Sequence, residues 1–171
     1  TGRISAASRR ALHTKLEMAR IRLQARSSVQ DAERMTRDWI GRDPNEGYPW
    51  WTLADLLRTQ GRFHEAVEAA QRAVDLDPNR TRSFEPRLAN CLAKADRLEQ
   101  AEETYQEMLA DHPDRALYWF WYAEYLVDHR PERVVEARQA LDRACDPNSP
   151  MPADPNDLAR LRRRLTGRGG Q

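Results

Sequence analysis

Histidine and cysteine, the residue types that most often carry out chemistry in proteins, are few in this sequence and widely separated. The four histidines are His13, His64, His112 and His129. Glu65 follows His64, but the second histidine that a zinc-protease helix needs four residues further on is missing. Asp111-His112 and Asp128-His129 could lie close together at turns between helices, but they are better explained as ordinary polar residues on the surface. We therefore expect no metal site.

The two cysteines, Cys91 and Cys145, fall on the apolar stripes of predicted helices. They are interpreted as small buried residues rather than reactive thiols, and nothing in the chain requires a disulfide between them. The sequence also lacks a glycine-rich phosphate loop, a serine nucleophile turn and a Cys-x-x-Cys pair. These features favour a chain that is not an enzyme and holds no cofactor.

The chain has 171 residues, of which 40% are hydrophobic, and its 28 basic and 27 acidic side chains nearly cancel. This composition is typical of one soluble domain, and the longest apolar run, residues 116–123, is too short to span a bilayer. Because the chain starts at Thr1 and has no signal-peptide stretch, we expect a processed product or a domain cut from a longer protein. The compartment stays open, with the cytoplasm slightly favoured.

The charges are unevenly distributed. Residues 1–26 carry seven basic side chains and one acidic one, and residues 160–171 carry five arginines and no acid. The body between them is therefore acidic. Two interpretations stay open: solvated helix faces, or basic ends that meet an anionic surface such as nucleic acid.

Small residues and prolines recur with a period of about 34 residues, which is typical of repeat proteins. The recurring positions are Ala32, Ala66, Ala101 and Ala137, accompanied by Pro44, Pro78 and Pro113. Two residue types that keep one period predict four repeats, over residues 13–46, 47–80, 81–115 and 116–149.

Each repeat divides into two amphipathic helices. In the second repeat, Trp50, Leu53 and Leu57 fall on one face of the first helix. Gly61 then supplies the backbone freedom that a tight turn needs, and Asp96 takes that place in the third repeat. Because a lone pair of short helices cannot hide its second apolar face, we expect neighbouring pairs to stack.

The second repeat resembles a tetratricopeptide repeat at nearly every position of that family's pattern. The matching positions are Trp50, Leu53, Ala54, Leu57, Gly61, Phe63, Ala66, Ala73 and Pro78. The fourth repeat also resembles the half-a-tetratricopeptide repeat of RNA-processing scaffolds. The resemblance covers residues 13 to about 146 and implies an all-α fold: a right-handed α-solenoid of four helix pairs plus a C-terminal capping helix.

Shorter segments flank the repeats. Residues 1–12 are predicted to extend the first helix or to form an arm, and residues 150–156 to form a proline-rich linker. Leu158, Leu161 and Leu165 recur on one stripe and predict a capping helix over residues 157–166. Residues 167–171 are predicted to be a disordered tail.

The resemblance implies that the first helices of the repeats line a concave groove. Just off the packing face of these helices lie Trp51, Asp55 and Arg58, then Arg87, Asn90 and Lys94, then Phe120, Trp121 and Glu124. Their basic and amide groups could hold a carboxylate or peptide carbonyls, and the aromatic rings could anchor a partner. Alternatively, Trp51, Phe120 and Trp121 complete the core between repeats.

The chaperone-binding members of the family clamp a C-terminal carboxylate with lysine and asparagine. The corresponding stretch here offers Glu17, Met18 and Ile21, so the sequence does not match that clamp.

Three functions follow, in order of preference. The first is a non-catalytic adaptor that binds a peptide or helical segment of a protein partner in its groove. The second is a scaffold in an RNA-processing or other nucleic-acid complex, and the third is a regulatory domain of a larger enzyme. The ends of the solenoid could also mediate self-association.

Overall fold

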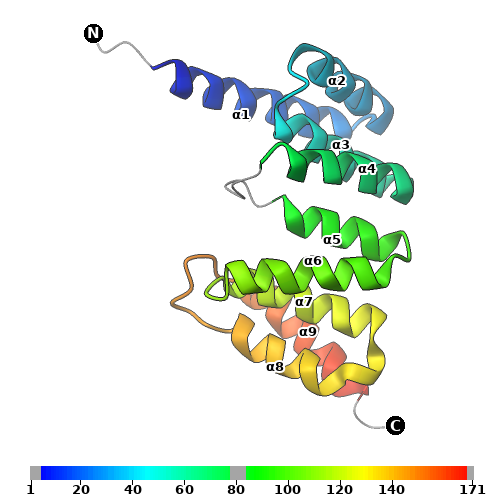
Figure 1. Cartoon of the computed structure of the whole chain (residues 1–171), viewed down its shortest axis with the longest axis vertical. Helices are drawn as coiled ribbons and strands as arrows, with labels where there is room; N and C mark the ends of the chain where they lie inside the picture. The colour runs from blue at the N-terminus through cyan, green and yellow to red at the C-terminus, as the bar shows by residue number, and fades with distance from the viewer. Residues whose placement is uncertain (1–4, 78–83, 169–171) are drawn as a thin grey trace. The chain divides into compact units, whose positions relative to one another are not determined.

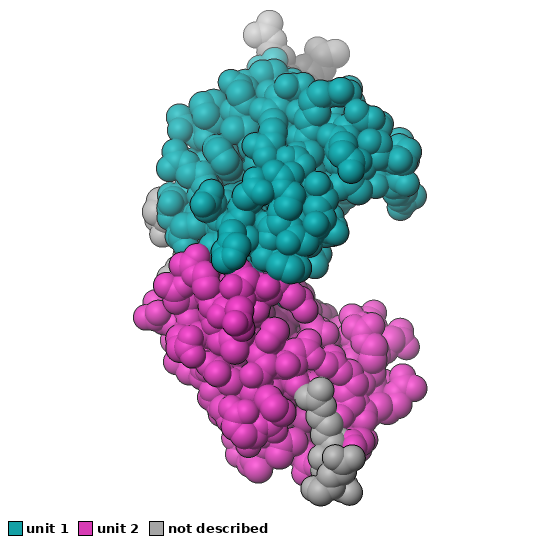
Figure 2. All heavy atoms as spheres, turned by 90° about the vertical axis from the view of Figure 1, so that its right-hand side faces the viewer, with its two compact units in different colours: residues 1–91 teal, residues 92–171 magenta. Residues whose placement is uncertain are grey.

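The computed structural model describes residues 5–77 and 84–168, and the chain divides into two compact units, residues 1–91 and 92–171 (Figure 2). Over the described residues the structure is helical and contains no strand (Figure 1). The elements are α1 (Ala6–Ala25), α2 (Val29–Arg42), α3 (Gly47–Thr59), α4 (Phe63–Asp75), α5 (Glu85–Lys94), α6 (Leu98–Asp111), α7 (Ala116–His129), the short 3-10 helix η1 (Pro131–Arg133), α8 (Val134–Ala144) and α9 (Pro155–Arg168). Pro78, at the predicted end of the second repeat, lies outside the described residues.

The recurring alanines occupy equivalent places. Ala32, Ala66, Ala101 and Ala137 are each the fourth residue of their helix, in α2, α4, α6 and α8. Each of these four alanines is at most 1% exposed to solvent. A methyl group at this position lets paired helices approach closely, so the alanine period of the sequence is a packing period.

In the first unit, α1 packs on α2, and α3 packs on α4. Ile21, Ala32, Trp39 and Leu56 form its core at the N-terminal end. The Ser28 side chain accepts a hydrogen bond from the backbone N–H of Asp31 and so caps α2. α1 is longer than its partner, and its N-terminal turns project beyond α2 (Figure 1).

The turns after α3 and α5 share one form, the Schellman motif, in which a residue in the left-handed region closes the helix. After α3, Gly61 has a φ of 75°, and the next N–H donates to the Leu57 carbonyl at 3.0 Å. After α5, Asp96 has a φ of 60°, and the next N–H donates to the Leu92 carbonyl at 2.9 Å. The aspartate therefore replaces glycine at a steric cost of about 1 kcal/mol.

An arginine clamp joins neighbouring repeats in the first unit. Arg62, just before α4, contacts Glu33 of α2 at 2.8 Å and Glu65 of α4 at 2.5 Å. Partial burial raises the pKa of Glu33, but hydrogen bonds from Gln60, Arg37 and Arg62 outweigh it and lower that pKa overall. The carboxylate is therefore held charged between two repeats.

The second unit contains an equivalent clamp. Arg133, just before α8, contacts Glu102 of α6 and lies 2.7 Å from Glu136 of α8. The Tyr122 hydroxyl donates to Glu136 at 2.7 Å, and burial together with this bond raises the pKa of Tyr122. The clamps show that contacts between repeats recur in both units.

The proline-rich segment after α8 forms hydrogen bonds with the start of α7. The Ser149 hydroxyl accepts from the N–H of Ala116 at 2.8 Å and donates to the Asp114 carbonyl at 2.7 Å. The Leu117 N–H donates to the Met151 carbonyl at 2.9 Å. These bonds satisfy N–H groups at the start of α7, where the flanking Arg115 side chain provides no cap.

α9 begins two residues before the predicted capping helix and continues to Arg168, so Gly167 is helical rather than part of a tail. Its buried Leu161 and Leu165 belong to the unit that also contains α7 and α8, and α9 contacts both of those helices. At the other end, residues 6–12 belong to α1. Residues 1–4 and 169–171 lie outside the described residues.

Candidate functional site

Four of the predicted groove residues come together in the first unit, and Asn90 lies one helical turn after Arg87 on the same helix. Trp51, Asp55 and Arg58 lie on α3, and Arg87 and Asn90 lie on α5; we call this set the α3–α5 cluster. Asp55 is its centre, because its Oδ1 accepts from Arg58 Nη2 at 2.9 Å and from Arg87 Nη1 at 3.0 Å. The spacing of Asp55 and Arg58, three residues on one helix, makes the first contact local.

The cluster has more donors than acceptors. Arg58 and Arg87 share one carboxylate, so one positive charge is left uncompensated among the three groups. The Nε atoms of both arginines and the Oδ1 of Asn90 are buried and have no hydrogen-bond partner among the described residues. Buried polar atoms are normally paired, so these three atoms leave hydrogen-bonding capacity unused inside the cluster.

An aromatic ring borders these charges. The Arg87 guanidinium lies over the Trp51 ring, 5.3 Å from its centroid. The side chains of Arg87, Arg58 and Asp55 are 23%, 28% and 38% exposed, so the cluster is partly open to solvent. It can therefore offer a partner both a charged donor and a flat apolar surface.

Cys91 lies behind the cluster. Burial raises the pKa of its thiol to about 11, against the lowering effect of Arg87 and Arg58. The thiol is therefore protonated at neutral pH and is not a nucleophile. Cys145 is only half-buried, unlike the buried residue predicted from the sequence, and accepts from Arg162 Nη2 at 3.4 Å.

The predicted site residues of the second unit behave differently. Phe120 is 4% exposed, so the expectation that it anchors a partner is wrong: its ring belongs to the core. Trp121 is half-buried and stacks on Tyr118 with ring centroids 5.7 Å apart. Lys94, the last residue of α5, is exposed.

Glu124 faces α9. Burial raises the pKa of its carboxyl, the Asp128 carboxylate raises it further, and Arg160 and Arg164 of α9 oppose them. Arg164 also pairs directly with Asp128. The side of α7 that carries Glu124 is thus covered by a helix of the same chain.

Two models of the tetratricopeptide repeat family match the sequence, one over residues 16–81 and the other over residues 57–120. Together they extend over the helix pairs that position the α3–α5 cluster. The chain belongs to the tetratricopeptide repeat family. No curated protein sequence gives a significant match.

Solved structures agree with this tetratricopeptide repeat assignment in fold. "MamA RS-1 ArsTM double mutant" is similar with a TM-score of 0.62 and 18% identity, over 91% of this chain and 94% of that chain. "MamA 41-end from Desulfovibrio magneticus RS-1" has a TM-score of 0.61 and 19% identity, over 91% and 93%. "MamA MSR-1 C2" has a TM-score of 0.54 and 15% identity, over 87% and 74%. The all-α fold predicted from the sequence is confirmed.

Tetratricopeptide repeats are typically non-catalytic modules that bind other proteins, so the family supports a protein-interaction adaptor in general. The described part of the chain contains no group of three or more His, Cys, Asp or Glu side chains able to hold a metal ion. Nor does any helix among residues 5–77 and 84–168 have the length and apolar character needed to cross a membrane.

The residues of this tetratricopeptide repeat protein at the clamp position are already engaged. Glu17 pairs with Arg20 at 3.2 Å and with Arg42 at 3.6 Å, and Ile21 is 1% exposed in the core. Neither is available to hold a ligand carboxylate.

A pocket on α1 that involves Lys15, Met18 and Arg22 was not predicted from the sequence. The spacing of three and four residues between these side chains is the signal for it, because it places them on a common helix face. The capping role of Ser149 was not predicted either, because that hydrogen bond joins residues far apart in the sequence.

Proposed function

We propose that this tetratricopeptide repeat protein is a non-catalytic adaptor that binds a segment of a partner protein on the α3–α5 cluster. The observation that carries the proposal is the shared carboxylate of Asp55. It holds Arg58 and Arg87 in place while leaving one positive charge uncompensated at a surface that is partly open to solvent. Pre-positioned donors lower the entropic cost of binding.

An extended peptide suits the chemistry of the cluster. Its backbone carbonyls, or an acidic side chain, accept from the two guanidinium groups. An apolar side chain of the peptide can lie against the ring of Trp51, beside Arg87.

The test begins with capture of partner proteins from the source organism on the immobilised chain. The bound segment is mapped by crosslinking and then made as a synthetic peptide, whose affinity is measured by calorimetry. Trp51→Ala and Arg87→Glu are each expected to weaken binding about tenfold or more, because aromatic and arginine anchors dominate such interfaces. Arg138→Glu, at an exposed position of α8, is the control with the same charge change.

Thermal unfolding measured by circular dichroism separates loss of the site from loss of the fold. The proposal expects melting temperatures close to that of the unsubstituted chain. Arg87→Gln supplements Arg87→Glu, because a glutamate would face Asp55. If the peptide binds all of these variants equally well, the α3–α5 cluster is not the binding site.

A scaffold that binds nucleic acid is the second candidate, and the basic ends of the chain favour it. On α9, however, Arg160 pairs with Asp157 at 3.0 Å, and Arg164 pairs with Asp128. These contacts reduce the charge available to phosphates. RNA binding that weakens steeply with salt would support this candidate, and no RNA retention at low salt would remove it.

A further inference from the structure

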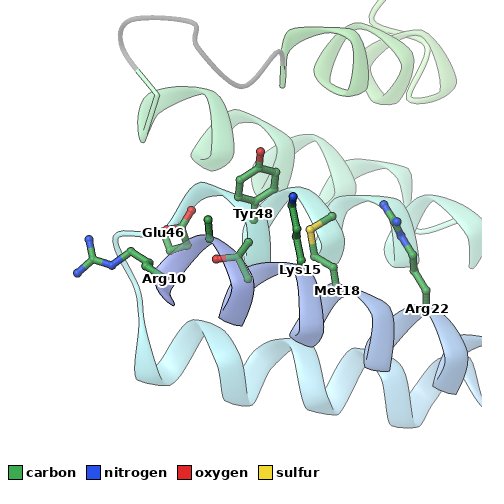
Figure 3. A pocket seen from close by; sticks show the side chains of 8 residues that line it. Arg10, Lys15, Met18, Arg22, Glu46 and Tyr48 are labelled. Carbon is green, nitrogen blue, oxygen red and sulfur yellow. The ribbon is translucent and has the colours of Figure 1, made fainter. Parts of the chain in front are cut away.

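A second candidate binding site lies entirely within the first unit, apart from the α3–α5 cluster. A pocket of about 610 Å³ is formed by α1 and the start of α3 (Figure 3). Lys15, Met18 and Arg22 project from one side of α1, and Tyr48 projects from the first turn of α3 (Figure 3). Its volume lies in the range of typical ligand sites, about 300–1,000 Å³.

The pocket is predominantly basic. Arg10, Lys15 and Arg22 line it, against Glu46 as the acidic lining residue. Among the described residues, none of the three basic side chains forms an ion pair or hydrogen bond, in contrast to Arg20 on the same helix, which pairs with Glu17. Their charges are therefore available to an acidic ligand.

The middle of the pocket is apolar. Met18 lies between Lys15 and Arg22 along α1, and Ala11 and Tyr48 also line the space. The Tyr48 ring packs edge-on against Phe84, with centroids 5.3 Å apart, which fixes its position. A thioether beside a fixed aromatic ring adapts readily to an aliphatic or aromatic side chain.

The spacing of the charges suggests the form of the ligand. Lys15 and Arg22 are seven residues apart on α1, which corresponds to about 10 Å along a helix. Along an extended chain, side chains four residues apart lie on the same face, about 13 Å apart, with one side chain of that face between them. Two flexible acidic side chains at this spacing, with an apolar side chain midway, would thus reach the two cations with Met18 between them.

We propose that this pocket binds an acidic segment of a partner protein, with carboxylates on Lys15 and Arg22 and an apolar side chain on Met18 and Tyr48. The inference rests on the proposed function, peptide binding, but uses residues outside the α3–α5 cluster. A peptide is favoured over RNA, because Glu46 lies in the lining and would repel phosphates. The apolar centre of the pocket would also contribute little to the affinity for a phosphate backbone.

The test uses fluorescence anisotropy with four labelled probes and the full chain. The first is the C-terminally amidated peptide Gly-Gly-Glu-Glu-Leu-Phe-Glu-Glu-Gly. The second has lysine in place of each glutamate, the third has serine in place of Leu-Phe, and the fourth is an oligouridylate. The first peptide is expected to bind, and the lysine and serine peptides to bind about tenfold more weakly or not at all.

Two charge reversals locate the site. Lys15→Glu and Arg22→Glu are each expected to weaken binding of the first peptide about tenfold, as for loss of a charge-assisted hydrogen bond. Both side chains are exposed, so the fold is expected to persist. Lys15→Arg should preserve binding, and Arg9→Glu, exposed on α1 outside the pocket lining, should change it by less than about twofold.

Failure of the first peptide to bind, or equal binding by Lys15→Glu and Arg22→Glu, would overturn the inference. Oligouridylate binding that depends on the same two residues more strongly would assign the pocket to nucleic acid instead. The proposed function is tested separately by Trp51→Ala and Arg87→Glu. Loss of partner binding there, with the acidic peptide unaffected, would show that the two sites are independent.

Discussion

α3 and α7 begin their respective repeats with the same architecture but present different surfaces. Trp50 on α3 donates its indole N–H to the Pro44 carbonyl at 3.0 Å, and Trp119 on α7 donates to the Pro113 carbonyl at 2.8 Å. The next residues of the two helices differ in solvent exposure: the Trp51 side chain is partly open to solvent, whereas the Phe120 side chain is buried.

The same divergence continues along the two helices. Asp55 on α3 holds two arginines at a partly open surface, whereas Glu124, its counterpart on α7, faces α9. The framework contacts are thus repeated, while the surface available to partners is not. A residue's position in the repeat therefore does not by itself make it a binding residue, because another helix can cover it.

The largest expected effect tests the shared framework. Leu57 on α3 and Leu126 on α7 are equivalent and at most 1% exposed. Leu57→Ala and Leu126→Ala are each expected to lower the free energy of unfolding by about 2–5 kcal/mol through lost burial and a residual cavity. Urea unfolding measures both.

The control for these two variants is Leu23→Ala, at a position that is 68% exposed. It should change the free energy of unfolding by less than about 0.5 kcal/mol. If one core leucine proves as tolerant as Leu23, the two helices are not equivalent parts of the framework.

A smaller effect tests the long-range cap of α7, in which the Ser149 hydroxyl accepts from the Ala116 N–H. Ser149→Ala removes the hydroxyl that links Ala116 and Asp114, and is expected to cost about 1–2 kcal/mol in urea unfolding. Thr104→Ala, at an exposed hydroxyl that bonds only locally to the Gln100 carbonyl, is the control and should change stability by less than about 0.5 kcal/mol. Equal effects of the two variants would contradict the capping role.

The turns after α3 and α5 allow a comparison with opposite signs. Gly61→Ala is expected to destabilise the protein by about 1 kcal/mol, because alanine is strained at a φ of 75°. Asp96→Gly is expected to stabilise it by up to about 1 kcal/mol, because the strain of aspartate at a φ of 60° is relieved. Thermal unfolding measures both changes, and shifts of the same sign would contradict the account.

The smallest expected effect is a pH dependence of opposite sign at two glutamates. The pKa of Glu33 is lowered from 4.5 in the folded state, so its stabilising contribution is present above that pH and is lost as the pH falls below it. The pKa of Glu124 is raised from 4.5, so its contribution is greatest below that pH and is lost as the pH rises.

At neutral pH, Glu33→Gln should therefore destabilise the protein and Glu124→Gln should stabilise it. Each change should be at most about 1 kcal/mol, because solvent screens both carboxyl groups. Unfolding free energies measured across the acidic range test this. Parallel profiles for the two variants would show that their surroundings do not differ as described.

The fold was accessible from the sequence because it depends on local periodicity. The spacing of the alanines predicts where paired helices contact, and Gly61 predicts the turn between them. Both features can therefore be predicted from residues that are close in the sequence. The arginine clamps were harder to predict, because Glu33 and Arg62 belong to different repeats. Their contact depends on how the helices pack.

The candidate site was predictable only in part. Trp51, Asp55 and Arg58 lie just off the packing face of α3, and Arg87 of α5 contacts Asp55 and Trp51. Phe120 and Glu124 follow the same positional rule, but burial of the ring and the presence of α9 over Glu124 change their roles. The repeat period does not predict contacts with α9, because α9 follows the last repeat.

Indole N–H signals in a nitrogen-15 correlation NMR spectrum test the central claim most directly. The five tryptophans, Trp39, Trp50, Trp51, Trp119 and Trp121, can be assigned with Trp→Phe variants. On titration with the mapped partner peptide, the account predicts that the Trp51 signal shifts while those of Trp119 and Trp121 stay in place. A shift of Trp121 with Trp51 unchanged would contradict it.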